Sequence, residues 1–360
     1  MQRRKFLTGA AGAATGLAAA SQLPKPAIAQ ERIEWTMVTP WPKGAPGVGV
    51  NAQRAADMIT QLSGGRLTVS LFAGGELVPP FEAFDAVSNG NADCLHGTPY
   101  YWVGKSPSFN WFTGIPFGLA ANEFMGWIYF GEGQALWDEA YAPFGVKPFY
   151  AGSSGVQSGG WFRTEITGLD DLQGLKFRIA GMGGEVMSRL GVQVVLMPPG
   201  EIFSSMDSGV IDAAEWVGPW NDLAFGLHRI AKFYYQPAFH EAGPSLEFSV
   251  NQASYDALPD DLKQLVAAVA RANTSTAIAD FQFNNAVSLR PLVEENGVQL
   301  RLWPQEIVDA VRTTSTEVIA EVAASEPMAT KVNDAYQAFL AQAVEWSRWS
   351  DQAYLAARNA

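Results

Sequence analysis

The chain has 360 residues, of which 48% are hydrophobic and 17% charged, and its formal net charge is −12 at pH 7. A chain of this composition can bury a large core, which excludes a disordered, collagen-like or fibrous coiled-coil protein, and its length favours two domains or one large α/β unit. Lys and Arg are too few to neutralise a row of phosphates, so we expect no nucleic acid partner.

We predict that residues 1–29 are a signal peptide and not part of the fold. Arg3 and Arg4 belong to a charged head, residues 7–20 are apolar and rich in Ala and Gly, and residues 27–29 supply the small side chains of a peptidase site. The paired arginines resemble a twin-arginine export signal, so we expect a periplasmic protein. The apolar run is too short and too rich in Gly for a transmembrane helix.

The first predicted elements after the signal alternate between strand and helix. Residues 35–38 and 67–72 have the short apolar patterns of strands, and residues 51–62 between them have the spacing of an amphipathic helix. This βαβ beginning favours an open, mostly parallel sheet. Cys94 is the only cysteine, so the fold has no disulfide, and we expect its thiol to be buried.

Two small-residue stretches predict where the chain crosses between lobes. Residues 149–155 (FYAGSSG) continue a strand into small residues, and residues 242–244 (AGP) precede an alternating pattern typical of a returning strand. Two crossings imply two α/β lobes joined by a hinge. The predicted division is lobe I, residues 30–151 plus 244–285; lobe II, residues 152–243 plus 286–326; and a C-terminal helical segment, residues 327–360.

Two short segments, one in each half of the chain, resemble each other. In residues 84–93 and in residues 205–212, a helix end capped by Gly leads into a short strand that is predicted to begin two residues before an Asp. Similar segments in the two halves are what two similar α/β lobes would contain.

The last third of the chain is predicted to be mainly helical. Pro259 and the two following Asp residues open a long helix, because Pro suits the first helical turn and acidic groups favour the helix N-terminus. Residues 331–360 place apolar side chains on most sides of a further long helix. Such a helix needs burial on several sides, so we expect it to join two copies in a homodimer; the alternative is that it folds back on its own lobes.

The common enzyme motifs are missing from the sequence. It contains no G-x-S-x-G, H-E-x-x-H, P-loop or paired C-x-x-C motif, and His96, His228 and His240 have no recognisable partner spacing. Residues 181–184 (GMGG) follow a strand and open a helix, as a dinucleotide-binding loop does, but the third glycine of that fingerprint is missing. We therefore favour a plain tight turn there.

Four polar residues lie in aromatic or glycine-rich surroundings: Gln157, Arg178, Glu215 and Glu241. Polar and charged groups in such surroundings must be paired, coordinated or exposed, and any one of the four, taken singly, is more often structural than functional. Removal of the signal would lower the basic residues from 24 to 20 against 36 acidic ones, a formal charge of −16. An anionic ligand would then need local positive charge, which makes Arg178 the most interesting of the four.

Longer motifs around these residues resemble those of a known family. Residues 169–178 (LDDLQGLKFR) resemble the D-L-x-G-L-K-x-R segment of the solute receptors of tripartite ATP-independent periplasmic (TRAP) transporters. Four further segments resemble the branch that binds 2-oxo and 2-hydroxy monocarboxylates through a metal ion: residues 73–79 (AGGELVP), 100–105 (YYWVGK), 155–163 (GVQSGGWFR) and 215–219 (EWVGP). The resemblance covers essentially the whole chain after the signal.

This resemblance implies how the ligand is held. Arg178 would bind its carboxylate, for which the planar guanidinium fork is well suited. Ser153 stands where the 2-oxo acid receptors carry an asparagine, which leaves the identity of the acid open. The aromatic residues Trp161, Trp216, Trp220 and Phe239 would fit an apolar tail of the acid or belong to the core, and the predicted ligand-binding set is Arg178, Gln157, Ser153, Trp216, Tyr101 and Trp161.

The resemblance also implies a bound cation that bridges the ligand to the protein. Its ligands would be the Gln157 side chain, the Glu215 carboxylate, the backbone carbonyl of Trp216 and the Glu241 carboxylate. A set made only of oxygen atoms suits Na⁺ or Ca²⁺ and not Zn²⁺.

The function that we predict is periplasmic capture of a small monocarboxylate, such as pyruvate or lactate, and its delivery to a TRAP membrane permease. The fold would be an α/β periplasmic binding protein with two hinged lobes and a long C-terminal dimerisation helix, and not an enzyme. Within this class, an aromatic acid, a sugar acid or a polyol is the alternative ligand. The alternative from another class is an exported metal-dependent lyase or hydrolase with Glu215 and Glu241 as acid and base.

Overall fold

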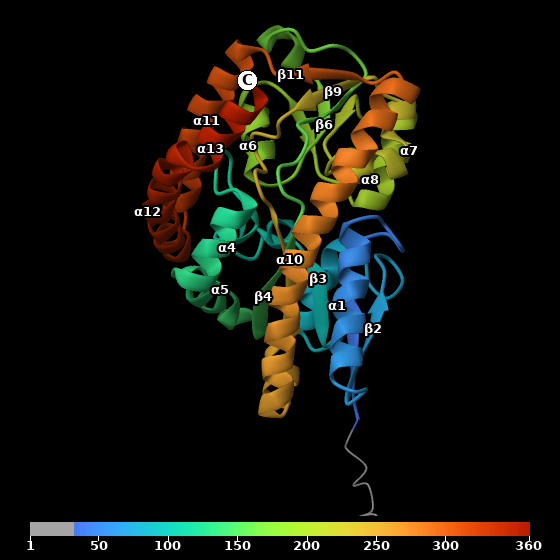
Figure 1. The fold of residues 1–360 in the computed structure, drawn as a ribbon, viewed down its shortest axis with the longest axis vertical. Coiled ribbons are helices and arrows are strands. Elements are labelled where there is room, and N and C mark those ends of the chain that lie inside the picture. Colours follow the sequence, from blue (N-terminus) through green and yellow to red (C-terminus); the bar gives the residue numbers. More distant parts are fainter. Residues whose placement is uncertain (1–31) are drawn as a thin grey trace, which may run out of the picture.

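The computed structural model describes residues 32–360, so the predicted signal peptide lies outside the described residues. The described chain forms two β-sheets covered by helices, and one long helix runs past both sheets (Figure 1). Within residues 32–360, no helix is long and apolar enough to cross a membrane.

The first sheet has the strand order β2-β1-β3-β10-β4. Its strands are β1 (Ile33–Val38), β2 (Leu67–Phe72), β3 (Cys94–Gly97), β4 (Val146–Ser153) and β10 (Ser245–Asn251). Helix α1 (Val48–Leu62) connects β1 to the parallel strand β2, so the predicted βαβ beginning is confirmed. Cys94 is buried in β3, as expected.

The second sheet has the strand order β11-β9-β5-β8-β6-β7. Its strands are β5 (Gly160–Phe162), β6 (Lys176–Arg178), β7 (Gln193–Val195), β8 (Ala213–Ala214), β9 (Phe233–Gln236) and β11 (Gln299–Leu302). The other α-helices before the C-terminal segment are α2 (Ala83–Ser88), α3 (Phe109–Thr113), α4 (Ala121–Phe130), α5 (Gly133–Tyr141), α6 (Gly181–Arg189), α7 (Ile202–Asp207), α8 (Pro219–Phe225), α9 (Gln252–Asp256), α10 (Asp260–Arg290) and α11 (Gln305–Ala324). Short helical turns of four or five residues lie at Pro99–Trp102, Leu169–Leu172 and Pro291–Glu295.

Both sheets are mostly parallel, as expected, and each contains one strand that runs against the others. Strand β10 runs antiparallel to β3 and β4, and β5 runs antiparallel to β8 and β9. Each of these strands enters its sheet directly after a short crossing from the other sheet. It therefore starts at the edge where the parallel strands end and must run in the opposite direction.

The two similar sequence segments occupy corresponding places in the two sheets. Helices α2 and α7 end before Gly90 and Gly209, which both have positive φ, and each leads to the central parallel strand of its sheet. The strands begin directly after Asp93 and Asp212 and not before them, because these side chains accept hydrogen bonds from the backbone N–H groups of Thr36 (2.8 Å) and Lys176 (3.0 Å) in the neighbouring strands. The sheets therefore share a local device that ties two parallel strands together.

Helix α10 connects the two sheets. It begins after Pro259, with Asp260 and Asp261 in its first turn, as predicted. It packs against α1 and β4 of the first sheet and against α8 of the second (Figure 1). The residue boundaries of the two predicted lobes stay a prediction.

The predicted C-terminal helix consists of two helices, α12 (Pro327–Trp349) and α13 (Asp351–Asn359). The chain bends at Ser350, whose hydroxyl donates to the carbonyl of Trp346 at 2.9 Å, a local bond that competes with regular helix geometry. The first half of α12 packs on α3, α4 and α5. Tyr336 anchors it: the side chain is fully buried and its hydroxyl accepts the backbone N–H of Leu119 at 2.7 Å.

The later half of this segment leaves large apolar side chains exposed. Trp346 is 71% exposed and Trp349 81% exposed, and Tyr354 in α13 is 66% exposed. Packing on the protein's own helices therefore buries the apolar side chains of the first half of the segment only.

Replacement of Tyr336 tests this division. We expect Tyr336→Ala to lower the free energy of unfolding by about 3 to 5 kcal/mol, the usual cost of removing a large buried ring. In dilute protein, Tyr354→Ala should change it by less than about 0.5 kcal/mol. Urea unfolding measures both values, and equal effects of the two substitutions would contradict the different packing of the two halves.

Candidate functional site

The candidate site lies where the carboxyl ends of the parallel strands of both sheets meet. Trp41 follows β1, Tyr101 follows β3, Arg178 ends β6, and Glu215 follows β8. The ends of parallel strands are the usual place for a ligand in an α/β sheet, because loops there are free to carry functional side chains. Strands β1 and β3 of the first sheet and strands β6 and β8 of the second therefore deliver these side chains.

A small cavity of about 20 Å³ lies between the sheets. Its lining includes Trp41, Tyr100 and Tyr101 from the first sheet and Trp216 from the second. A volume of this size holds on the order of one water molecule. The two halves therefore close tightly over the site.

Arg178 is fully buried and joins the two halves of the protein beside this cavity. Its Nη1 donates to the backbone carbonyl of Glu215 at 2.9 Å and forms an ion pair with the Glu215 carboxylate, while its Nη2 lies 3.4 Å from the hydroxyl of Tyr101. Its Nε has no hydrogen-bond partner among the described residues. The Nε and Nη2 edge is thus the part of the guanidinium that can take a carboxylate in a bidentate manner.

Several buried oxygen atoms beside Arg178 have no hydrogen-bond donor within residues 32–360. They are Oε2 of Glu215, both carboxylate oxygens of Glu241 and Oε1 of Gln157. Burial of such atoms without a partner is costly, most of all for charged ones. Because the atoms are all oxygens and two side chains are carboxylates, this donor set fits a hard cation such as Na⁺ or Ca²⁺. The cation ligands implied by the family resemblance are therefore chemically suited to that ion.

The charges of the buried side chains also favour a bound cation. Arg178 offers one positive charge to two buried carboxylates, those of Glu215 and Glu241. Burial and the nearby negative charge of Glu215 together raise the pKa of Glu241 to about 7. A cation between the two carboxylates would oppose both effects.

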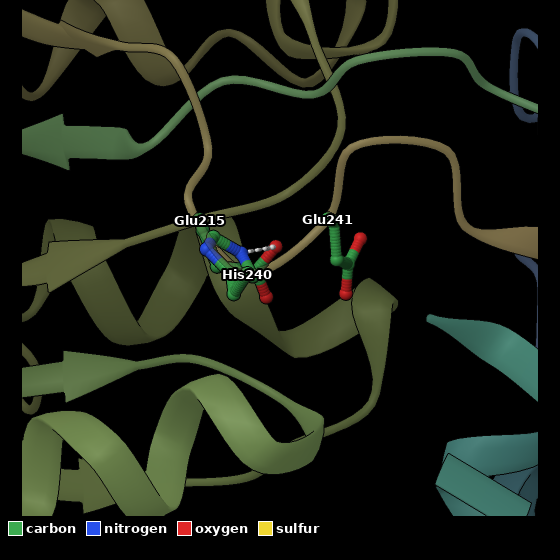
Figure 2. Close-up of side chains that lie close together, drawn as sticks. All are labelled: Glu215, His240 and Glu241. Carbon is green, nitrogen blue, oxygen red and sulfur yellow. Dashed lines mark ion pairs between the residues drawn. The ribbon is translucent and has the colours of Figure 1, made fainter. Parts of the chain in front are cut away.

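His240 belongs to this cluster, although its sequence spacing gave no sign of it. Its Nε2 lies 3.7 Å from Oε2 of Glu215, and ligand atoms of Glu215, His240 and Glu241 all lie within 4.8 Å of one another (Figure 2). A Cβ atom at Gly183 would lie 2.5 Å from the Cβ of His240, so the GMGG turn leaves room for this histidine. Its position directly before Glu241 was the available sequence signal.

Three of the predicted ligand-binding residues do not line the cavity: Arg178, which contacts Tyr101 of the lining, and Trp161 and Ser153. Trp161 is fully buried in the second sheet, where its indole donates to Asp222 at 2.8 Å and stacks on Tyr234. The hydroxyl of Ser153 accepts the backbone N–H of Gly155 at 3.2 Å. Trp161 is a core residue because its polar N–H has a buried partner there.

The structure also brings residues to the cavity that the sequence did not single out. Ser154 lines the cavity in place of the predicted Ser153. The Ser154 hydroxyl accepts a hydrogen bond from Nε2 of Gln157 at 3.0 Å, which leaves the amide oxygen of Gln157 free. Trp41 stands against Trp216 with ring centroids 6.2 Å apart, and the Trp216 ring lies 5.7 Å from the Arg178 guanidinium. The place of Trp41 just after a strand was the signal for it.

Two sheets that enclose a buried arginine and a cluster of uncompensated oxygens define a receptor for a small solute. Comparison with known proteins agrees. The chain belongs to the family of bacterial extracellular solute-binding proteins, family 7, which matches residues 41–326. It is thus a solute-binding receptor of the TRAP type, as the motifs predicted, and not an enzyme, so the lyase or hydrolase alternative is set aside.

Individual relatives are similar over nearly their whole length. The chain is 38% identical over 358 residues, 98% of both chains, to the monocarboxylate 2-oxoacid-binding periplasmic protein all3028 of Nostoc sp.. A TRAP periplasmic solute binding protein from Pseudoalteromonas atlantica, solved with bound sodium and pyruvate, is 35% identical, with a TM-score of 0.87 and coverage of 90% of this chain and 99% of that one.

A third relative adds another cation and ligand. A TRAP transporter solute binding protein from Bordetella bronchiseptica is 33% identical, with a TM-score of 0.88 and coverage of 90% of this chain and 96% of that one. Its crystal structure is a mixed occupancy dimer in which calcium and picolinate copurified in one active site and the other site is apo.

The clustered carboxylates lead to a prediction for Glu241→Gln. This change removes one of two neighbouring buried negative charges, so we expect a higher midpoint of thermal unfolding in cation-free buffer. The stabilisation by added Ca²⁺, about 2.7 kcal/mol at a hundred times the Kd, should be largely lost. Calorimetric unfolding with and without Ca²⁺ measures both effects. Glu185→Gln on the surface of α6 is the control, and equal behaviour of the two variants would refute the cation site.

Proposed function

We propose that this TRAP receptor binds a small 2-oxo monocarboxylate, with pyruvate as the first candidate, together with Na⁺ or Ca²⁺. The observation that carries the proposal is the set of donor-free buried oxygens of Gln157, Glu215 and Glu241 next to the open edge of Arg178. The sodium and pyruvate of the Pseudoalteromonas relative support it.

In this proposal the protein binds the ligand through two kinds of contact. The Nε and Nη2 edge of Arg178 binds the carboxylate, while Nη1 stays on Glu215. Gln157, Glu215, the carbonyl of Trp216 and Glu241 hold the cation, which supplies a positive charge to the 2-oxo or 2-hydroxy oxygen of the ligand. No bond of the ligand is made or broken.

The cavity walls favour a short or flat acid. Trp41, Tyr101 and Trp216 surround it with aromatic rings, which suit a short or flat acid better than the hydroxyl groups of a sugar acid or polyol. An aromatic acid is the second candidate ligand, because the Bordetella relative holds picolinate with calcium.

We further propose how the receptor is delivered and how it works. The twin-arginine pathway would export it to the periplasm, and the lobes predicted from the sequence would close over the ligand by a hinge at residues 154–159 and 237–244. These two crossing segments carry Gln157 and Glu241, so closure and cation binding would be coupled. The closed receptor would then deliver the acid to the TRAP membrane permease.

The C-terminal segment is proposed to form a homodimer. Trp346, Trp349 and Leu355 are exposed on α12 and α13, and a second copy would cover them. The dimer of the Bordetella relative supports this arrangement.

The ligand proposal predicts that pyruvate binding depends on the cation. Removal of metal with a chelating resin should weaken pyruvate binding about 30-fold or more, which corresponds to about 2 kcal/mol, because the anion would face two uncompensated carboxylates. Titration calorimetry with pyruvate, lactate, benzoate and mannitol measures this dependence and ranks the ligand classes.

Arg178 variants provide the control for that experiment. Arg178→Met should lose measurable pyruvate binding, and Arg178→Lys should bind more weakly because it lacks the fork. Unchanged pyruvate affinity in metal-free protein would contradict the bridging cation, and near wild-type affinity in a folded Arg178→Met variant would contradict the role of the arginine.

The dimer proposal has its own measurement. Light scattering at micromolar concentration should give the mass of two chains for the wild type and of one chain for the double variant Trp346→Glu, Trp349→Glu, because buried unpaired charges disrupt an apolar interface. Pyruvate affinity should stay the same, since both residues lie far from the site in sequence and fold. A monomeric wild type would overturn the proposal.

A further inference from the structure

We propose that Asp222 is a positioning residue that sets the geometry of the cation site without touching the cation. The inference rests on the proposed function, because it concerns the same cation. Asp222 lies in α8 and is fully buried. Its carboxylate is the centre of a hydrogen-bond network that reaches all three segments carrying the proposed cation ligands.

The carboxylate of Asp222 accepts four hydrogen bonds. Oδ1 accepts the backbone N–H groups of Val217 at 3.1 Å and Gly218 at 3.2 Å. Oδ2 accepts the indole N–H of Trp161 at 2.8 Å and the hydroxyl of Tyr234 at 2.7 Å. Each oxygen thus accepts two hydrogen bonds: Oδ1 holds the backbone after Trp216, and Oδ2 holds side chains of two strands of the second sheet.

The two backbone donors fix the first ligand segment. Val217 and Gly218 directly follow Trp216, whose carbonyl is a proposed cation ligand. Because the carbonyl of Trp216 and the N–H of Val217 belong to one rigid peptide unit, the bond to Asp222 sets the direction of that carbonyl. Glu215, one residue earlier, is fixed on its other side by the bond from its N–H to the carbonyl of Arg178 at 3.0 Å.

Tyr234 extends the network to the second ligand segment. Nε2 of Gln236 donates to the hydroxyl of Ser158 at 2.6 Å, this hydroxyl donates to Tyr234 at 2.6 Å, and Tyr234 donates to Asp222. All donors in this series of hydrogen bonds point toward the carboxylate of Asp222, so the negative charge of that carboxylate strengthens each bond. Ser158 is the neighbour of Gln157, the proposed amide ligand.

Backbone bonds join the third segment to the other two. The N–H of Ser158 donates to the carbonyl of Val217 at 3.0 Å, and the N–H of Gln157 donates to the carbonyl of Glu241 at 3.1 Å. The segments with Gln157, Glu215 and Glu241 are therefore held in one frame, and Asp222 is its charged centre. Without that centre the frame would keep its backbone bonds but lose the tie to α8.

The chemistry of the side chain makes Asp222→Asn a sharp substitution. A carboxylate is able to accept from all four donors, whereas an amide must turn its NH₂ group toward two of them. Burial raises the pKa of Asp222 to about 6 although the four donors oppose the shift, so the group is ionised at neutral pH. The variant therefore loses two bonds and the charge with almost no change in shape.

The experiment compares cation binding in three variants of the purified protein. We expect Asp222→Asn to weaken Ca²⁺ binding about 10- to 100-fold, the usual effect of losing a group that orients metal ligands. It should also change the ratio of Na⁺ to Ca²⁺ affinity, which a general loss of stability would not do. Tyr234→Phe removes one donor only, folds more readily, and should show a smaller change of the same kind.

Glu247→Gln is the matched control. Glu247 is also a fully buried carboxylate that accepts an indole N–H, from Trp102 at 2.9 Å, but it lies in the first sheet. The hydrogen bonds that its side chain accepts come from Trp102 and Ser249, which lie outside the three cation segments. The substitution should lower stability and leave both cation affinities unchanged. Titration calorimetry with CaCl₂ and NaCl gives these values.

The outcomes separate this inference from the proposed function. If the wild type binds Ca²⁺ and pyruvate, and folded Asp222→Asn and Tyr234→Phe bind Ca²⁺ with wild-type affinity and ion preference, Asp222 is structural only. If Glu247→Gln changes cation binding as much as Asp222→Asn does, the effect is one of stability and the inference is likewise overturned. A wild type that binds neither cation would overturn the proposed function itself, and the inference with it.

Discussion

Burial of two carboxylates beside a single arginine is the constraint on which this structure depends. Glu215 and Glu241 lie between the sheets with Arg178 as their one buried positive partner among the described residues of the cluster. A protein interior tolerates such a charge only if something else compensates it. The oxygen atoms without donors thus form a deficit that a cation would satisfy, and the unpartnered Nε of Arg178 is the donor that an anionic ligand would satisfy.

The arrangement of the sheets follows from that need. The parallel strands of each sheet bring Tyr101 and Arg178 to the shared edge, and the crossing segments bring Gln157 and Glu241. The same crossings force β5 and β10 to run antiparallel to their neighbours. In the proposed function, the two crossing segments are both the hinge and carriers of cation ligands, so the free energy of ligand binding would be available to favour the closed arrangement.

The sequence predicted the parts of this protein that depend on local pattern. Strand β1, helix α10 and the family motifs around Arg178 were all predicted, because side-chain periodicity, Pro and acidic residues at helix starts, and ordered motifs are local signals. The direction of β10 depends on where the chain enters the sheet. Whether Trp161 is core or ligand wall depends on a partner, Asp222, that is 61 residues away. Contacts of this kind leave no pattern in a single sequence.

The network around Asp222 also shows why a binding site with a charge deficit is compatible with a stable fold. Every polar group that supports the proposed ligands is satisfied: Trp161 and Tyr234 donate to Asp222, and Ser158 donates to Tyr234. The atoms that would meet the cation and the anion, such as both carboxylate oxygens of Glu241, are left without partners. A large core can offset the cost of burying these atoms, and the free energy stored there would become binding energy when the ligand arrives.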